Sequence, residues 1–235
     1  MRRFRLLLTN DDGWDSPGLA ALKTASSALG ELFVLAPSSA YSQCSHTVTT
    51  EGGLRLVQTG PECYRLEGAP ADCVRVAIRS LYAEGWFDCV ISGINRGGNL
   101  GADIHMSGTV AAAREAALLG VPAIAISQFI RRGLELDWAI SAQLAVPVLE
   151  ELLERGCEGK TFWNVNLPHG RDASTDAGAA MVVHCEPDDL PLDVRYTREG
   201  DVFRYAGHYQ SRPRTPRRDV DLCFGGAVTV SKLRV

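Results

Sequence analysis

The sequence predicts an α/β fold, a mostly parallel sheet with helices on both faces, followed by a C-terminal β-rich hairpin or arm region. In the first two thirds of the chain, short β-rich runs alternate with helical patterns, which is typical of βαβ units. Hydrophobic residues make up 46% of the 235 positions, enough for one large domain with a sizeable core. After Pro168 the helical periodicity fades and only short β-like runs remain.

The chain opens with a strand, a helix and a second strand. Residues 5–9 form an apolar run that is typical of a buried strand. A serine and a proline then supply an N-cap and a first helical position for a helix over residues 18–29. The next apolar run, residues 32–36, stops at a proline, which cannot donate a hydrogen bond to a neighbouring strand.

The middle of the chain continues this alternation. A proline opens a helix predicted over residues 70–82, because apolar side chains recur on one of its faces. Residues 87–92 are predicted as a strand, and the Ala-rich residues 108–119 as a helix. Residues 122–127 form another short apolar run and are predicted as the following strand.

The pattern changes in the last third of the chain. Residues 137–155 are helical in pattern, although Pro147 within them must kink or split the helix. Residues 162–167 form the next strand. The later β-like runs are residues 180–184, 202–205 and 227–233. We therefore expect one domain that consists of a core, residues 1–168, and a β-rich oligomerisation arm, residues 169–235, since isolated hairpins are marginal in water.

Composition excludes several classes of protein. The chain has 24 Lys and Arg against 28 Asp and Glu, a formal net charge of −4, so no stable nucleic-acid partner is expected. No apolar run approaches the roughly 18 residues needed to span a bilayer, and the first one is too short for a signal peptide. Seven cysteines include no C-x-x-C pair, which argues against a zinc ribbon or redox motif. We expect them to be reduced, in a cytoplasmic protein.

Polar residues follow the predicted strands. Asp11 and Asp12 come directly after the first strand, Ser42 lies beyond the second, and the glycine-rich segment 92–101 follows the strand at 87–92. In open α/β sheets, ligands bind beyond the carboxyl ends of the strands. Two adjacent carboxylates repel each other, and a divalent cation such as Mg²⁺ or Mn²⁺ would remove that repulsion. The alternative is an Asx-type turn, which Asn-Asp-Asp-Gly also favours.

A candidate anion site lies further along the chain. The glycine-rich segment matches neither the dinucleotide-binding G-x-G-x-x-G pattern nor a P-loop. Ser107, Gly108 and Thr109, however, lead into a predicted helix, and hydroxyls with free backbone N–H groups at a helix N-terminus bind anions. The alternative is a plain N-cap by Ser107. A divalent metal beside an anion-binding helix start is what phosphoester hydrolysis requires.

Two further features stay open at the level of sequence. Each of two histidines, His46 and His105, is either an acid–base residue or a structural one. The chain has no G-x-S-x-G motif that would assign a Ser-His-Asp triad. Residues 211–218 hold four arginines. They form either a solvated loop or an arm that contacts another subunit or an anionic substrate.

Segments with defined order and spacing run through nearly the whole chain. They are residues 7–13 with 17–18, 36–37 with 42 and 45–49, 68–74, 92–95, 99–101, 107–113, 164–168 and 219–226. Together these segments resemble the motifs of the SurE family, the survival-protein 5′/3′-nucleotidases. The resemblance implies a Rossmann-like metal-dependent phosphatase core with one divalent cation.

The resemblance also assigns roles to individual residues. The implied metal ligands are Asp11, Asp12, Ser42 and Asn95. The implied phosphate-binding residues are Asn99, Ser107, Gly108 and Thr109. Of these two sets, Asp11, Asp12 and Asn99 are the expected catalytic residues.

The function that the resemblance implies is hydrolysis of nucleoside 5′-monophosphates, with 3′-monophosphates as further candidates, to nucleoside and phosphate. Water is favoured over Asp11 as the attacking group, because a metal-bound carboxylate is a weakened nucleophile. The alternative is a catalytically silent nucleotide-binding regulatory protein on the same fold. The resemblance also implies a homodimer or homotetramer that exchanges C-terminal segments. No membrane partner is expected.

Overall fold

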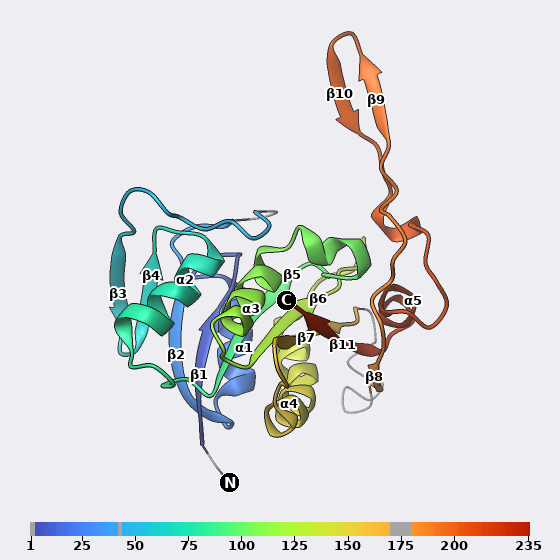
Figure 1. Cartoon of the computed structure of the whole chain (residues 1–235). Helices are drawn as coiled ribbons and strands as arrows, with labels where there is room; N and C mark the ends of the chain where they lie inside the picture. Colours follow the sequence, from blue (N-terminus) through green and yellow to red (C-terminus); the bar gives the residue numbers. More distant parts are fainter. Residues whose placement is uncertain (1–2, 42–43, 170–179) are drawn as a thin grey trace.

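The computed structural model describes residues 3–41, 44–169 and 180–235, and it confirms the α/β class (Figure 1). Five strands at the centre of one sheet pair in parallel. They are β2 (Gly30–Pro37), β1 (Phe4–Thr9), β5 (Cys89–Arg96), β6 (Ala123–Gln128) and β7 (Thr161–Leu167). Because all five run the same way, their carboxyl ends share one edge of the sheet.

Four shorter or later strands extend the sheet on both sides. At one edge β4 (Cys63–Leu66) runs parallel to β2, and β3 (Leu56–Gly60) pairs antiparallel with β4. At the other, β11 (Val228–Arg234) runs antiparallel to β7 and parallel to β8 (Val182–His184). The resulting order is β3-β4-β2-β1-β5-β6-β7-β11-β8.

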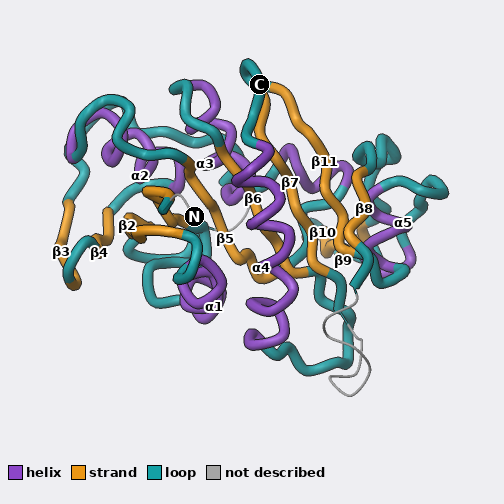
Figure 2. Tube along the Cα trace, turned by 90° about the horizontal axis from the view of Figure 1, so that it is seen from below, coloured by secondary structure: helices purple, strands orange, loops and turns teal. Residues whose placement is uncertain are grey.

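Helices cover both faces of this sheet (Figure 2). α1 (Pro17–Ser26) and α4 (Trp138–Arg155) share one apolar cluster, and α2 (Pro70–Val76) and α3 (Gly108–Leu118) share the other. Leu6 and Leu8 of β1 belong to the first cluster and Leu7 to the second, since successive side chains of a strand point to opposite faces. Each of these three leucines is fully buried and contributes about 1.5–3 kcal/mol to folding.

Two helices of the structure differ from their predicted form. The helix expected over 70–82 is regular only to Val76 and continues as a π-helical turn, Ala77–Leu81. The helix expected over 137–155 is neither split nor ended by Pro147, which lies inside α4. Pro147 is exposed, so solvent can satisfy the carbonyl group that its missing N–H leaves without a partner.

Three elements are absent from the sequence prediction. The edge hairpin β3–β4 is short and half-buried, so its hydrophobic alternation is weak. The strand β9 (Tyr196–Glu199) is exposed throughout, and α5 (Asp219–Phe224) has only six residues. None of the helices in the described ranges is long and apolar enough to cross a membrane.

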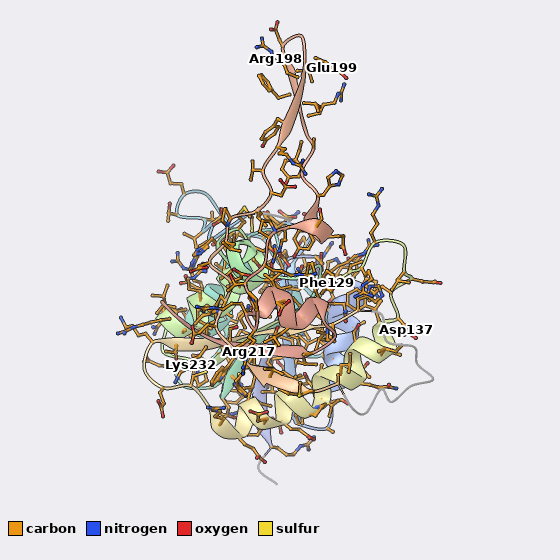
Figure 3. All side chains as sticks on the ribbon, turned by 90° about the vertical axis from the view of Figure 1, so that its right-hand side faces the viewer. Phe129, Asp137, Arg198, Glu199, Arg217 and Lys232 are labelled. Atoms are coloured by element: carbon orange, nitrogen blue, oxygen red, sulfur yellow. The ribbon has the colours of Figure 1, made fainter. Side chains whose placement is uncertain are left out.

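The C-terminal third contributes both to the body and to a projecting hairpin. β8 and β11 belong to the main sheet, so the expected division at residue 168 separates strands that pair with one another. Among the described residues β9 pairs only with β10 (Val202–Tyr205), and this hairpin stands away from the body (Figures 1 and 3). All residues of β9 and β10 are exposed.

Candidate active site

The loop after β1 is held by Asn10, a residue that the sequence prediction did not single out. The Asn10 side-chain amide donates to the Gly13 carbonyl at 2.8 Å and to the Ser16 hydroxyl at 2.7 Å, and its oxygen accepts from the Gly13 N–H at 3.2 Å. Gly13 adopts a φ of 105°, which a side chain would strain. The Asx-type turn therefore exists, and it is Asn10 that makes it. This leaves the carboxylates of Asp11 and Asp12 for other contacts.

Asp11 is buried, with 5% of its surface exposed. Its Oδ1 accepts a hydrogen bond from the Thr109 hydroxyl, and its backbone carbonyl accepts from the Tyr41 N–H at 2.7 Å. Burial raises the pKa of Asp11 to about 6; the Thr109 hydrogen bond opposes this shift, and the neighbouring charge of Asp12 adds to it. Ionisation of Asp11 is thus less favourable than that of an exposed aspartate, and a nearby positive charge would favour it.

The N-terminus of α3 meets Asp11 directly, and Gly108 makes this possible. A Cβ atom at Gly108 would lie 2.8 Å from the Cys44 sulfur and 3.0 Å from Cβ and Oδ2 of Asp11. Ser107 caps the helix through its hydroxyl, which accepts from the Val110 N–H at 3.0 Å. The N-cap by Ser107, which the sequence left open as the alternative, is therefore present, and the helix start also faces the carboxylate of Asp11.

Asp12 joins the first loop to the end of β5, where Asn95 lies. Oδ2 of Asp12 accepts from the Arg96 N–H at 2.8 Å. The amide nitrogen of Asn95 donates to the Gly97 carbonyl at 2.8 Å, which leaves its amide oxygen available as an acceptor or metal ligand. The structure therefore brings Asp11, Asp12 and Asn95 to the same edge of the sheet.

Asn99 is fixed by three residues that the sequence prediction did not assign to the site. Its N–H donates to Asn166 at 2.7 Å, and its side-chain amide donates to the Ser127 hydroxyl at 2.7 Å. Its carbonyl accepts from the side chains of Asn164 and Asn166 at 2.9 and 3.1 Å. The alternating asparagines of β7 therefore hold Asn99 in place, and their spacing of two residues puts both on one face of the strand.

The loop after β2 crosses the start of α3. Ser42, an expected metal ligand, lies outside the described residues. Beyond it, the Ser45 hydroxyl donates to the His105 carbonyl at 2.9 Å, and the Ser45 N–H donates to the Met106 carbonyl at 3.1 Å. The side chain of Asp72 accepts from the N–H and the hydroxyl of Thr49 at 2.8 and 2.9 Å. These contacts tie the loop to the segment that precedes α3 and to α2.

His46 is directed at a buried carboxylate. Its Nε2 lies 2.7 Å from Oε2 of Glu115 on α3, and Nε of Arg75 lies 2.6 Å from Oε1 of the same residue. Burial raises the pKa of Glu115, but the hydrogen bonds and charges of His46 and Arg75 outweigh it and hold that pKa below its ordinary value. The structure thus gives His46 an ion-pair partner, while His105 is exposed.

The arginine-rich segment, residues 211–218, contains an arginine with a structural role. Arg212 is only 5% exposed; it donates to Asp103 Oδ2 at 2.8 Å and to the Leu100 carbonyl at 3.0 Å. The buried carboxylate of Asp219 accepts from the Gly101 N–H at 2.8 Å. The loop that follows Asn99 is therefore anchored by the C-terminal segment of the chain.

A metal would have to rely on few charged ligands. The described residues contain no group of three or more His, Cys, Asp and Glu side chains that could hold a metal ion. The donors available are the two carboxylates of Asp11 and Asp12 and the amide oxygen of Asn95, all hard oxygen ligands. The buried, paired carboxylates fit a divalent cation, because its charge would offset their desolvation and repulsion.

Comparison with known proteins identifies close relatives. Residues 6–186 match the family model described as "Survival protein SurE". A protein of Synechocystis sp. is 45% identical over 97% of this chain and 99% of its own length, and the 5′-nucleotidase SurE of Geotalea daltonii is 45% identical over 70% of this chain and 65% of its own. The crystal structure of the SurE protein from Aquifex aeolicus superposes with a TM-score of 0.84 at 32% identity, covering 98% of this chain and 93% of that one.

Proposed function

Because this chain belongs to the SurE family, we propose that it is a phosphomonoesterase that hydrolyses nucleoside 5′-monophosphates to nucleoside and inorganic phosphate. The observation that carries this proposal is that Asp11 contacts the N-terminus of α3, while Asp12 is hydrogen-bonded to the end of β5 that holds Asn95. Such a place offers hard oxygen ligands beside backbone N–H groups, which is the chemistry that a phosphoryl group needs. Nucleoside 3′-monophosphates are further candidate substrates.

Asp11 and Thr109 act as a pair in this proposal. The Thr109 hydroxyl fixes the carboxylate of Asp11 and takes up one of its acceptor sites. A buried carboxylate that is already hydrogen-bonded is a poor nucleophile. We therefore assign the attack on phosphorus to a water molecule, and assign to Asp11 the task of holding positive charge near the phosphate.

Asn99 and Gly108 face the phosphate in this proposal. Asn99 is held by hydrogen bonds to its backbone, so its side-chain amide is positioned without further ordering when substrate binds. In this proposal the N–H group of Gly108, in the first turn of α3, donates to a phosphate oxygen. Ser107 contributes by capping this helix.

The proposed cofactor is one divalent cation, Mg²⁺ or Mn²⁺, held by Asp11, Asp12 and Asn95, with Ser42 as the fourth protein ligand. When bound, such a cation neutralises charge on the phosphoryl oxygens and lowers the pKa of a bound water. The support for it is the chemistry of the donors and the unfavourable burial of Asp11.

A phosphatase assay tests this proposal. Release of phosphate from 5′-AMP and 3′-AMP should stop in excess chelator and return with Mg²⁺ or Mn²⁺. Asp11→Asn and Asp12→Asn should each abolish release while far-UV circular dichroism stays unchanged, and Asp189→Asn, an exposed aspartate of the body, should behave like the parent chain. Full activity in excess chelator would refute the metal, and nucleotide binding without hydrolysis would favour the silent regulatory alternative.

A further inference from the structure

A cleft of about 630 Å³ opens beside the candidate active site, between the loop after β1 and the loop before α4. Its lining includes the polar residues Asp12, Asp15, Arg96 and Glu135 and the apolar residues Leu134 and Trp138. A volume of this size is usual for sites that hold small organic ligands. The cleft shares Asp12 with the candidate metal site, so the two places adjoin.

Trp138 forms a fixed wall of this cleft. A Cβ atom at Gly18 would lie 3.0 Å from Cη2 of Trp138, so the indole packs directly against the start of α1. Trp138 is half-buried and also touches the apolar cluster beneath α4. By contrast, Leu134 has 46% of its surface exposed, an unusually open position for a large apolar side chain that lines a cleft.

We propose that this cleft receives the nucleoside, and in particular the base, of the nucleotide substrate; this inference rests on the function proposed above. With the phosphate beside Asp11 and α3, the cleft that Asp12 lines is the neighbouring space that can take the rest of the nucleotide. A base is flat, apolar on its faces and polar on its edge. The indole of Trp138 and the side chain of Leu134 suit the faces.

The polar residues of the cleft suit the edge of a base. Asp15 and Glu135 are acceptor-only carboxylates when charged, so they match the amino and ring N–H donors that nucleobases carry. Arg96 is held through its backbone N–H by Asp12, and its side chain is exposed beside the cleft, where a guanidinium can stack on a base. The cleft thus discriminates nucleotides from sugar phosphates.

The test compares two substrates that differ only by the base, 5′-AMP and ribose 5-phosphate, in two leucine variants. Leu134→Asp alters the cleft. Leu118→Asp is the matched control, since Leu118 is 48% exposed and lies at the end of α3, away from the cleft. Leu134→Asp should lower kcat/KM for AMP about tenfold or more, through KM, and leave ribose 5-phosphate within about twofold. Trp138→Leu should act in the same direction.

Calorimetric titration with adenosine gives a reading that does not need hydrolysis. The parent chain and Leu118→Asp should bind adenosine equally, and Leu134→Asp should bind it about tenfold more weakly. An equal loss of kcat/KM for AMP and ribose 5-phosphate in Leu134→Asp would overturn the cleft assignment, even if AMP is hydrolysed. Adenosine binding that is unchanged in Leu134→Asp would overturn it too. If no phosphate ester is hydrolysed while adenosine binding still depends on Leu134, the cleft assignment stands and the proposed function fails.

Discussion

At the scale of single residues, the Thr109 hydroxyl holds the carboxylate of Asp11 through a hydrogen bond. The sequence placed Thr109 at a helix start that faces phosphate, and in the structure its hydroxyl donates to Asp11. The side chain is fully buried, so this hydrogen bond has no competition from solvent. We therefore predict that Thr109 acts on the phosphate through Asp11.

Thr109→Val keeps the shape of the side chain and removes the hydroxyl. We expect the apparent affinity for Mg²⁺ or Mn²⁺, read from activity against metal concentration, to fall about 10–100-fold, because ligand orientation is lost. Thr109→Ser should restore most of it. An unchanged metal dependence in the valine variant would show that Thr109 is only a packing residue.

At the scale of elements, two glycines set how closely helices approach the sheet. A Cβ atom at Gly18 would lie 2.0 Å from the Ile94 carbonyl oxygen, a backbone atom of β5 that cannot move away. At Gly108 the nearest atoms belong to the side chains of Cys44 and Asp11, at 2.8–3.0 Å. The first glycine therefore serves the docking of α1, and the second serves the geometry of the site.

The two alanine substitutions should separate these roles. Gly18→Ala should lower the melting temperature strongly or prevent folding, since it forces α1 off β5. Gly108→Ala should fold with a small change in melting temperature and lose most phosphatase activity, because Asp11 must shift. Thermal melts and phosphate release on both variants check this, and an active Gly108→Ala enzyme would contradict the close approach of α3 to Asp11.

Glu115 joins α3 to α2 and to the loop after β2, and its loss should be costly. Glu115→Gln leaves Arg75 and His46 without the buried carboxylate that they contact. Because the side chains of Arg75 and His46 are 41% and 23% exposed, solvent offsets part of this loss, and we expect a cost of about 1–3 kcal/mol in the free energy of unfolding at pH 7. Glu151→Gln is the matched control: Glu151 also contacts a histidine and an arginine, His184 and Arg155, but is 42% exposed. Its loss should cost at most about 1 kcal/mol.

The lowered pKa of Glu115 predicts that the stability of the fold depends on pH. The pKa of Glu115 in the folded chain lies below its ordinary value of 4.5, so its stabilising contribution is fully present above pH 4.5. It is lost as the pH falls through the lower folded pKa. In urea titrations the difference in the free energy of unfolding between the parent chain and Glu115→Gln should therefore be largest at neutral pH and should decrease below pH 4.5. A difference that is constant with pH would mean that shape, rather than charge, explains the cost.

At the scale of the whole molecule, the β9–β10 hairpin has apolar side chains without cover. Tyr196, Val202, Phe203 and Tyr205 are each more than half exposed. A two-stranded hairpin is marginal by itself in water, so we predict that it is covered by a second copy of the chain. A dimer, or a tetramer built from such dimers, is the expected assembly.

Light scattering at micromolar concentration checks the assembly. Phe203→Asp in the hairpin should give monomers, and Met181→Asp in the body, at a residue of similar exposure, should not: Phe203 is 63% and Met181 67% exposed. Removing residues 196–205 alone should have the same effect as Phe203→Asp. A cut after Pro187 is unsuitable, because it removes β11 from the main sheet. A full-length monomer would refute the assembly.

The sequence by itself determined the alternation of strands and helices, and with it the edge of the sheet where Asp11, Asp12 and Asn95 meet. These features could be predicted because hydrophobic period, prolines and helix caps act over a few neighbouring residues. Elements were missed where the signal was weak, as with the half-buried hairpin β3–β4 and the exposed β9.

Only the tertiary structure decided which partners the polar side chains choose. In the structure, hydrogen bonds connect the Thr109 hydroxyl to Asp11 and His46 to Glu115. Another connects Gly101 to Asp219, 118 positions apart in the sequence. No local pattern encodes such contacts, because each depends on two elements being brought together by the packing of the whole sheet. The cleft beside Asp12 arises in the same way, since its walls come from loops that lie far apart in the chain.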